Sequence, residues 1–138
     1  SPIIEKNEAD ILLCFEQLEA LRWINYAKKD ASIIINTQKI DPMPVITGKA
    51  KYPEGILEKI KAGYPNVISV PALEIAKKCG NIKAANVVMI GVLARNTDIS
   101  ADTWIKAIER NVKPQFAEVN RRAFNAGYAY AADVNEPV

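Results

Sequence analysis

The sequence has no histidine among its 138 residues. It therefore lacks the side chain that most often acts as a general acid or base near neutral pH and that most often binds transition metals. It also has only two cysteines, Cys14 and Cys79, which cannot supply the four thiolates of a zinc or iron–sulfur site. Both lie in apolar or helical contexts, so we expect two buried free thiols, although a disulfide stays open at this point.

Long apolar runs and an excess of one charge are absent too. No stretch approaches the roughly 18 consecutive apolar residues of a membrane-spanning helix. Residues 1–69 hold 9 basic and 9 acidic side chains and residues 70–138 hold 9 and 7, so neither half is basic enough to predict a nucleic-acid partner. The first residues have neither the basic nor the apolar part of a secretory signal peptide, which predicts a cytoplasmic protein without membrane association.

Glycine-rich functional motifs are missing as well. The six glycines are scattered, and neither a phosphate-binding loop nor a Gly-x-Ser-x-Gly turn occurs. Because these motifs are missing, we do not expect an autonomous nucleotide-dependent enzyme.

The chain also does not begin with methionine, which predicts processing, a tag or an origin inside a longer gene product.

What the sequence does contain is an alternation of strand-like and helix-like segments. Residues 9–15, 32–36 and 67–70 are short apolar runs of the kind that form strands buried on both faces. Residues 16–24 carry an apolar stripe at helical spacing, and the charged residues 28–30 are expected to end that helix.

The segment after the second strand is rich in proline. Because the residue before a proline avoids the helical conformation, residues 41–44 are predicted to be extended, and residues 45–47 to form a short edge strand. Pro53 is expected to open a further helix that ends at Gly63.

The second half is predicted to be helical. One helix is expected to open at Pro71 and to be closed by Gly80, a second to cover residues 84–94, and a third to run from its N-cap Ser100 to Val112, with a last helix starting at Pro114. In the last helix, one shared face is formed by Phe116, Val119, Ala123, Phe124 and Gly127. Together these patterns predict an α/β fold, a three-layer α/β/α arrangement with a mostly parallel small sheet and a helix-rich C-terminal half. We expect residues 1–132 to form a single domain and residues 133–138 to form a flexible tail.

Candidate ligand-binding residues follow from the position of the strands. In open α/β sheets, ligands bind beyond the carboxyl ends of the strands, which here indicates Glu16 after the first strand and Asn36 and Thr37 after the second. Glu16 could hold a substrate hydroxyl or a basic group of a partner, or it could simply favour a helix N-terminus. Asn36 and Thr37 could bond a ligand or satisfy the backbone of a turn.

Asn86 is the fourth candidate. It lies near the start of the apolar segment 84–94, where a buried amide without a partner would be costly, so we expect a partner in the main chain or in a ligand. Lys49 and Lys51 could contact an anionic cofactor, although solvated surface lysines are the more common case. No residue is predicted to be catalytic or to bind a metal.

Taken in order, several strings resemble one protein family. They are residues 8–22 (EADILLCFEQLEALR), 35–37 (INT), 51–53 (KYP), 76–81 (AKKCGN), 86–91 (NVVMIG) and 120–127 (NRRAFNAG). This order and spacing is similar to the gamma-type domain of 2-oxoacid:ferredoxin oxidoreductases, and within that family to the small (beta) subunits that act on indolepyruvate. The resemblance runs from about residue 1 to residue 128.

The resemblance implies a function in a complex. It implies oxidative decarboxylation of an aryl pyruvate with coenzyme A, giving an acyl-CoA, CO2 and reduced ferredoxin, in anaerobic metabolism. Thiamine diphosphate and the iron–sulfur clusters are then expected in a large partner subunit, with Glu16, Asn36, Thr37 and Asn86 of this chain as candidate cofactor-binding residues. The chain itself is expected to bind no cofactor alone and to be inactive in isolation, since a partner supplies the chemistry.

Two departures from the family pattern accompany the resemblance. Gln17 stands where a proline is expected, which changes the start of the first helix. The strand and Gly-x-Gly-Gly-Gln-Gly turn with which the resemblance implies that family members begin have no counterpart, so we expect the chain to correspond to the C-terminal three-quarters of such a subunit. Two other interpretations stay open, a stand-alone α/β module that binds an acidic small molecule and a self-associating scaffold, and a homodimer stays open as well.

Overall fold

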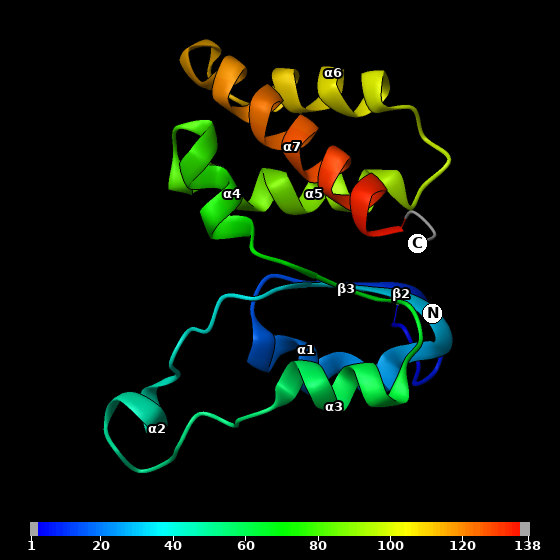
Figure 1. Ribbon diagram of the computed structural model, residues 1–138, viewed down its shortest axis with the longest axis vertical. Coiled ribbons are helices and arrows are strands. Elements are labelled where there is room, and N and C mark those ends of the chain that lie inside the picture. Colours follow the sequence, from blue (N-terminus) through cyan, green and yellow to red (C-terminus); the bar gives the residue numbers. More distant parts are fainter. Residues whose placement is uncertain (1–2, 136–138) are drawn as a thin grey trace. The chain divides into compact units, whose positions relative to one another are not determined.

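The computed structural model describes residues 3–135, and these belong to two compact units that divide between Ser69 and Val70 (Figure 1). None of the helices formed by residues 3–135 is both long and apolar enough to cross a membrane.

The first unit is built on a parallel three-stranded sheet. Its strands are β1 (Ala9–Cys14), β2 (Ala27–Asn36) and β3 (Val67–Val70), in the order β1-β2-β3, and β3 ends where the second unit begins. The helices α1 (Gln17–Trp23) and α3 (Ile56–Gly63) lie together along this sheet (Figure 1). Their contact forms a core in which the buried residues are Cys14, Ala20, Ala27, Ala31, Ile33, Ile35, Ile56 and Ile60. The apolar runs that predicted the strands thus supply this core.

The second strand is longer than expected, and the first helix is shorter. α1 ends at Trp23, a 3-10 turn η1 (Ile24–Tyr26) follows, and residues 28–30 belong to β2 instead of ending a helix. The physical reason is pairing with β1, because Ala27 lies opposite Ala9 and the Lys28 ammonium lies 2.7 Å from the Asp10 carboxylate. The register between the two strands shifts in this region, and regular pairing resumes from Ile11 and Ser32.

The proline-rich segment also differs from expectation. Instead of an extended connection and an edge strand, the chain forms a one-turn helix, α2 (Met43–Ile46). Pro44 lies in the first turn, where its missing N–H leaves no bond unmade, and the Pro42 carbonyl accepts from the backbone N–H of Val45 at 2.9 Å. The helix α3 begins at Ile56, later than the predicted start at Pro53, after Gly55 in the left-handed conformation.

The second unit is a group of four helices. They are α4 (Ala72–Cys79), α5 (Ala85–Arg95), α6 (Ala101–Asn111) and α7 (Ala117–Asn135), with 3-10 turns η2 (Ile82–Ala84) and η3 (Pro114–Phe116) between them. As predicted, Gly80 ends α4 in the left-handed conformation and the Ser100 side chain caps α6.

Two expectations on the last helix are corrected. α7 continues through Asn135, so residues 133–135 are helical and not a loose tail, and residues 136–138 lie outside the described residues. Phe116 is 41% exposed because it lies in the 3-10 turn before the helix, whereas Ala123, Phe124 and Gly127 are buried as predicted.

The helices α5 and α7 cross in close backbone contact. A Cβ atom added to Gly91 on α5 would overlap the carbonyl oxygen of Phe124, and one added to Gly127 on α7 would overlap that of Val88. The glycines therefore allow a separation that no larger residue permits.

The α/β class, the small parallel sheet and the helix-rich second half are confirmed. The three-layer arrangement and the single domain over residues 1–132 stay predictions, since both concern how the two units combine.

Candidate functional site

The carboxyl end of the sheet brings three of the four candidate residues into one region. β1 ends at Cys14 and β2 at Asn36, and Cys14 lies opposite Ile35 in the parallel register. Glu16 lies two residues after the end of β1, Asn36 is the last residue of β2, and Thr37 follows it. Chain topology therefore places them together at the edge where α/β proteins bind ligands.

The Glu16 carboxylate is the centre of a hydrogen-bond network at this edge. It is only 9% exposed, and its Oε1 caps α1 by accepting from the backbone N–H of Glu19 at 2.9 Å. Its Oε2 accepts from the backbone N–H of Ile40 at 3.0 Å and from the Tyr52 hydroxyl. This position agrees with the interpretation that Glu16 favours a helix N-terminus, and the same carboxylate joins the loop after β2 to the segment before α3.

These contacts decide the charge of the carboxyl group. Burial by itself would raise the pKa of Glu16, but the hydrogen bonds from Ile40, Tyr52 and Glu19 outweigh it and lower the pKa below its ordinary value. Burial and the bond to Glu16 raise the pKa of Tyr52, whose oxygen also accepts from the backbone N–H of Leu18 at 2.9 Å. Glu16 is therefore an anion and Tyr52 a neutral donor at neutral pH.

Gln17 fixes the loop from the other side. Its backbone N–H donates to the Gln38 carbonyl at 3.0 Å, and its Nε2 donates to the Thr37 carbonyl at 2.5 Å. A proline here could make neither bond. The departure from the family pattern therefore supplies two contacts that hold the end of β2 against the start of α1.

Asn36 serves the turn that follows β2. It is 2% exposed, and its Oδ1 accepts from the backbone N–H of Gln38 at 3.2 Å, as expected of an asparagine that satisfies a turn. The side chain of Thr37 is half-buried, and its hydroxyl has no hydrogen-bond partner within residues 3–135. Of the three candidates at this edge, Thr37 is thus the one with an uncommitted polar group.

The remaining candidates lie elsewhere. Asn86 belongs to the second unit, and its side chain is exposed, so the expectation of a buried amide that needs a partner is corrected. The reason is that Asn86 lies on the outer side of α5, whereas Val88, Met89 and Val92 face inward. Lys49 and Lys51 are exposed, as solvated lysines are.

The thiols and the acidic groups do not form a metal site in the described part of the chain. Cys14 and Cys79 are free, the first buried and the second half-buried, which corrects the expectation that both are buried. Burial, with a smaller contribution from Glu19, raises the pKa of the Cys14 thiol to about 12. Within residues 3–135, no three Cys, Asp or Glu side chains are grouped to hold a metal ion.

Sequence reasoning missed Tyr52 and Ile40 as parts of this network. Tyr52 lies 36 residues from Glu16, and Ile40 contributes only its backbone N–H. The alternation of apolar and polar residues contains no signal for contacts at that separation.

The chain matches proteins of known family over nearly its whole length. The model of the pyruvate ferredoxin/flavodoxin oxidoreductase family matches residues 1–130. A protein named indolepyruvate oxidoreductase subunit IorB from Archaeoglobus fulgidus is 36% identical over 135 residues, which cover 95% of this chain and 67% of that protein. The protein of the same name from Pyrococcus horikoshii is 34% identical over 139 residues, covering 96% of this chain and 68% of its own length.

Solved structures share the fold. The gamma subunit of a keto/oxoacid ferredoxin oxidoreductase from Geobacter sulfurreducens superimposes with a TM-score of 0.68 at 24% identity, covering 95% of this chain and 69% of that one. A 2-oxoglutarate:ferredoxin oxidoreductase from Magnetococcus marinus, solved with 2-oxoglutarate, coenzyme A and succinyl-CoA bound, superimposes with a TM-score of 0.67 at 17% identity. This chain covers 22% of that longer protein.

Proposed function

Because this chain belongs to the pyruvate ferredoxin/flavodoxin oxidoreductase family, we propose that it is an accessory subunit of a ferredoxin-dependent 2-oxoacid oxidoreductase. The observation that carries the proposal is the match of about 95% of the chain to proteins named as a subunit of indolepyruvate oxidoreductase. The two free thiols support a reducing compartment, the cytoplasm, as the place of this complex.

The proposed substrate is indolepyruvate or another aryl pyruvate, with coenzyme A as the second substrate. In the reaction, the bond between the carboxylate and the oxo carbon breaks and CO2 leaves. The acyl group passes to the thiol of coenzyme A, and two electrons pass to ferredoxin. The names of the relatives support the choice of indolepyruvate.

The cofactors are assigned to the larger partner subunit. The residues of this chain do not fit an iron–sulfur cluster, since the whole sequence has two cysteines and these lie in different units. Thiamine diphosphate, held by the partner, would supply the stabilisation of the carbanion left by decarboxylation. Ferredoxin would then meet the complex through the partner.

The role of this chain is to position the edge of its sheet against the partner and coenzyme A. Glu16 and Asn36 hold the loop after β2, because their oxygens accept from the backbone N–H groups of Ile40 and Gln38. The loop carries Thr37, whose hydroxyl is uncommitted in the described part of the chain. We assign the contact to Thr37 and the positioning to Glu16 and Asn36, with Asn86 as a separate contact from the second unit.

The test is reconstitution. The full-length protein, its larger subunit, indolepyruvate, coenzyme A and a viologen dye are mixed, and dye reduction is followed with and without this chain. We expect omission to abolish coenzyme A-dependent reduction. Unchanged reduction without the chain would contradict the accessory role.

The site is tested in the same assay with Thr37→Val, which removes the hydroxyl and keeps the shape. We expect the KM for coenzyme A to rise about tenfold, because the loss of about 1.4 kcal/mol of binding free energy weakens affinity by that factor. Thr47→Val, at an exposed threonine after α2, serves as the control and is expected to leave the KM unchanged. An equal KM for Thr37→Val and the wild type would remove Thr37 from the site.

A further inference from the structure

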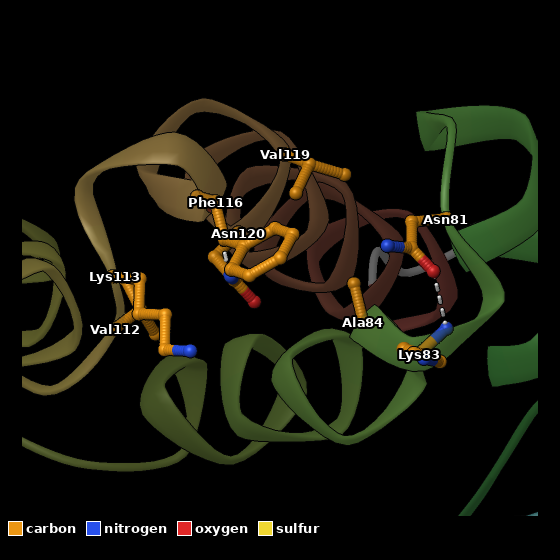
Figure 2. Close-up of a pocket in the computed structure, with 8 residues that line it drawn as sticks. All are labelled: Asn81, Lys83, Ala84, Val112, Lys113, Phe116, Val119 and Asn120. Carbon is orange, nitrogen blue, oxygen red and sulfur yellow. Dashed lines mark hydrogen bonds between the residues drawn. The ribbon is translucent and has the colours of Figure 1, made fainter.

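The second unit contains a pocket that the proposed reaction does not use. It lies where η2, the end of α6 and the start of α7 meet, and its volume is about 270 Å³. Figure 2 shows the eight side chains around it, Asn81, Lys83, Ala84, Val112, Lys113, Phe116, Val119 and Asn120. All eight belong to residues 70–138, so the pocket is contained in one unit.

Local hydrogen bonds and an ion pair hold the walls of the pocket. The Asn81 side chain accepts from the backbone N–H of Lys83 at 2.9 Å, and Asn120 Nδ2 donates to the Phe116 carbonyl at 2.9 Å. Arg121 joins α7 to α6, because its Nε lies 3.0 Å from the Glu109 carboxylate. The pocket is therefore a built feature of the helix junction.

The chemistry of the lining combines an apolar surface with positive charge. Ala84, Val112, Phe116 and Val119 are apolar, and Phe116 is 41% exposed. The lysines Lys83 and Lys113 stand at the sides, and Figure 2 shows the Lys113 ammonium directed inward. The lining holds no carboxylate, and neither ammonium has an ion-pair partner among residues 3–135.

The turn beside the pocket adds apolar surface. Ile82, next to Lys83, is 55% exposed. An exposed apolar surface between two lysines that have no ion-pair partner among residues 3–135 matches a partner surface that presents an apolar side chain between carboxylates.

The size of the pocket fits a single anchor side chain. Pockets for cofactors and drug-sized ligands range over about 300–1,000 Å³ and enclose most of the ligand. At about 270 Å³ this pocket lies just below that range and has room for one large apolar side chain, the kind of group that anchors protein interfaces.

We propose that this pocket is the docking point for an acidic segment of the larger partner subunit, which inserts one apolar anchor side chain between Lys83 and Lys113. The inference rests on the proposed function, because it takes the partner to be the larger subunit. It adds where that subunit binds and by which chemistry.

The experiment measures the affinity of the full-length protein for the larger subunit by titration calorimetry. Phe116→Ala removes the apolar wall and Lys113→Glu reverses one charge, and both positions are exposed, so the variants should fold, which circular dichroism checks. Leu73→Ala, at a leucine that is 40% exposed on α4, and Lys59→Glu, at an exposed lysine on α3, are the matched controls.

We expect each pocket variant to weaken binding at least about tenfold and each control to leave it within twofold. Added salt should weaken the wild type more than the Lys113→Glu variant, because it screens the attraction between the lysines and the acidic segment. Wild-type binding that the pocket variants leave unchanged would overturn the docking proposal while the proposed function stands. No binding by the wild type would overturn the proposed function itself.

Two further outcomes would assign the pocket to another occupant and so overturn the proposal. One is binding of indole-3-acetate, a small amphipathic anion, to the protein without the larger subunit, with loss of binding in Lys113→Glu. The other is self-association in analytical ultracentrifugation that Phe116→Ala abolishes.

Discussion

Glu16 keeps a negative charge although its side chain is 9% exposed, and three hydrogen-bond donors explain why. The donors come from Glu19, Ile40 and Tyr52, so residues from three segments of the chain converge on one carboxylate. A buried carboxylate with this many donors favours its ionised form. The stability of the first unit is therefore linked to the protonation of Glu16.

The linkage predicts a loss of stability in acid. Since the pKa of Glu16 is lower in the folded than in the unfolded chain, its contribution is present above the ordinary pKa of 4.5 and is lost as the pH falls through the folded value. We expect the free energy of unfolding, measured with urea between pH 7 and pH 3, to decline below about pH 4.5. Glu16→Gln should be about 1–3 kcal/mol less stable at pH 7 and show a smaller decline.

Tyr52→Phe separates the hydroxyl from the other donors. Without that bond the pKa of Glu16 moves back toward its ordinary value, so the decline in acid should shrink as well. Glu54→Gln, at an exposed glutamate, is the control and should follow the wild-type curve. A Glu16→Gln curve parallel to that of the wild type would contradict the role of Glu16.

Gln17 allows a test of the departure from the family pattern. Glu16 is already extended at φ −161° and ψ 151°, the conformation that a following proline requires, but the proline Cδ would replace the N–H that points at the Gln38 carbonyl oxygen 3.0 Å away, so the loop after β2 has to shift. Gln17→Pro removes two hydrogen bonds, whereas Gln17→Ala removes only the one from Nε2 to Thr37. We expect losses of about 1 kcal/mol for Gln17→Ala and about 2 kcal/mol for Gln17→Pro in urea unfolding. Equal stability of Gln17→Pro and the wild type would show that these bonds contribute nothing.

At the scale of elements, the contact between α5 and α7 is limited by two glycines. A Cβ at Gly91 would also come within 2.9 Å of the Tyr128 backbone nitrogen, and one at Gly127 within 2.9 Å of the Val88 carbonyl carbon. Backbone atoms cannot move aside as a flexible side chain can. The two helices would have to separate to admit even one methyl group.

We therefore predict that Gly91→Ala lowers the free energy of unfolding by about 3 kcal/mol, the upper part of the usual range for overpacking. Gly63→Ala at the end of α3 is the control, because a Cβ there meets no atom within 4 Å. That substitution should be neutral or slightly stabilising, since alanine restricts the unfolded chain. Thermal unfolding followed by circular dichroism measures both, and similar melting temperatures for the two variants would contradict the close packing.

At the same scale, local patterns predicted some elements well and others badly. The β-branched run at residues 67–70 and the apolar segment at 84–94 became β3 and α5 nearly as expected. α2 was missed because the restriction before Pro44 was applied without allowing for proline in a first helical turn. The start of β2 was missed because Lys28 resembles a helix end, whereas its place in a strand comes from the pairing of β2 with β1, in which Ala27 lies opposite Ala9.

At the scale of the whole molecule, the two thiols report on the two units separately. Cys14 lies in the core of the first unit and its pKa is about 12, so at pH 8 only about one thiol in ten thousand is ionised. Cys79, in the second unit, is half-buried. We expect iodoacetamide to modify Cys79 first and Cys14 only after the first unit opens.

Peptide mass spectrometry after timed alkylation measures this order. In the reconstituted complex, Cys79→Ser and Cys14→Ala should retain dye reduction, because neither thiol takes part in the proposed reaction. If Cys14 is modified as fast as Cys79, the burial of Cys14 is contradicted. If a folded thiol variant loses turnover, the proposal that the partner subunit carries the reacting groups is contradicted.

The amino-acid sequence by itself determined the fold class, most of the strand–helix order and the absence of imidazole and of cluster ligands. It could do so because composition and local periodicity depend only on neighbours along the chain. The tertiary structure alone decided that Glu16 meets Tyr52, that Thr37 keeps a hydroxyl without a partner in the described part of the chain, and that two lysines line a pocket with Phe116. Those contacts join residues far apart in the sequence, so they exist only once the chain has folded. The missing histidine thus excluded one kind of chemistry, and folding decided which of the remaining side chains can act.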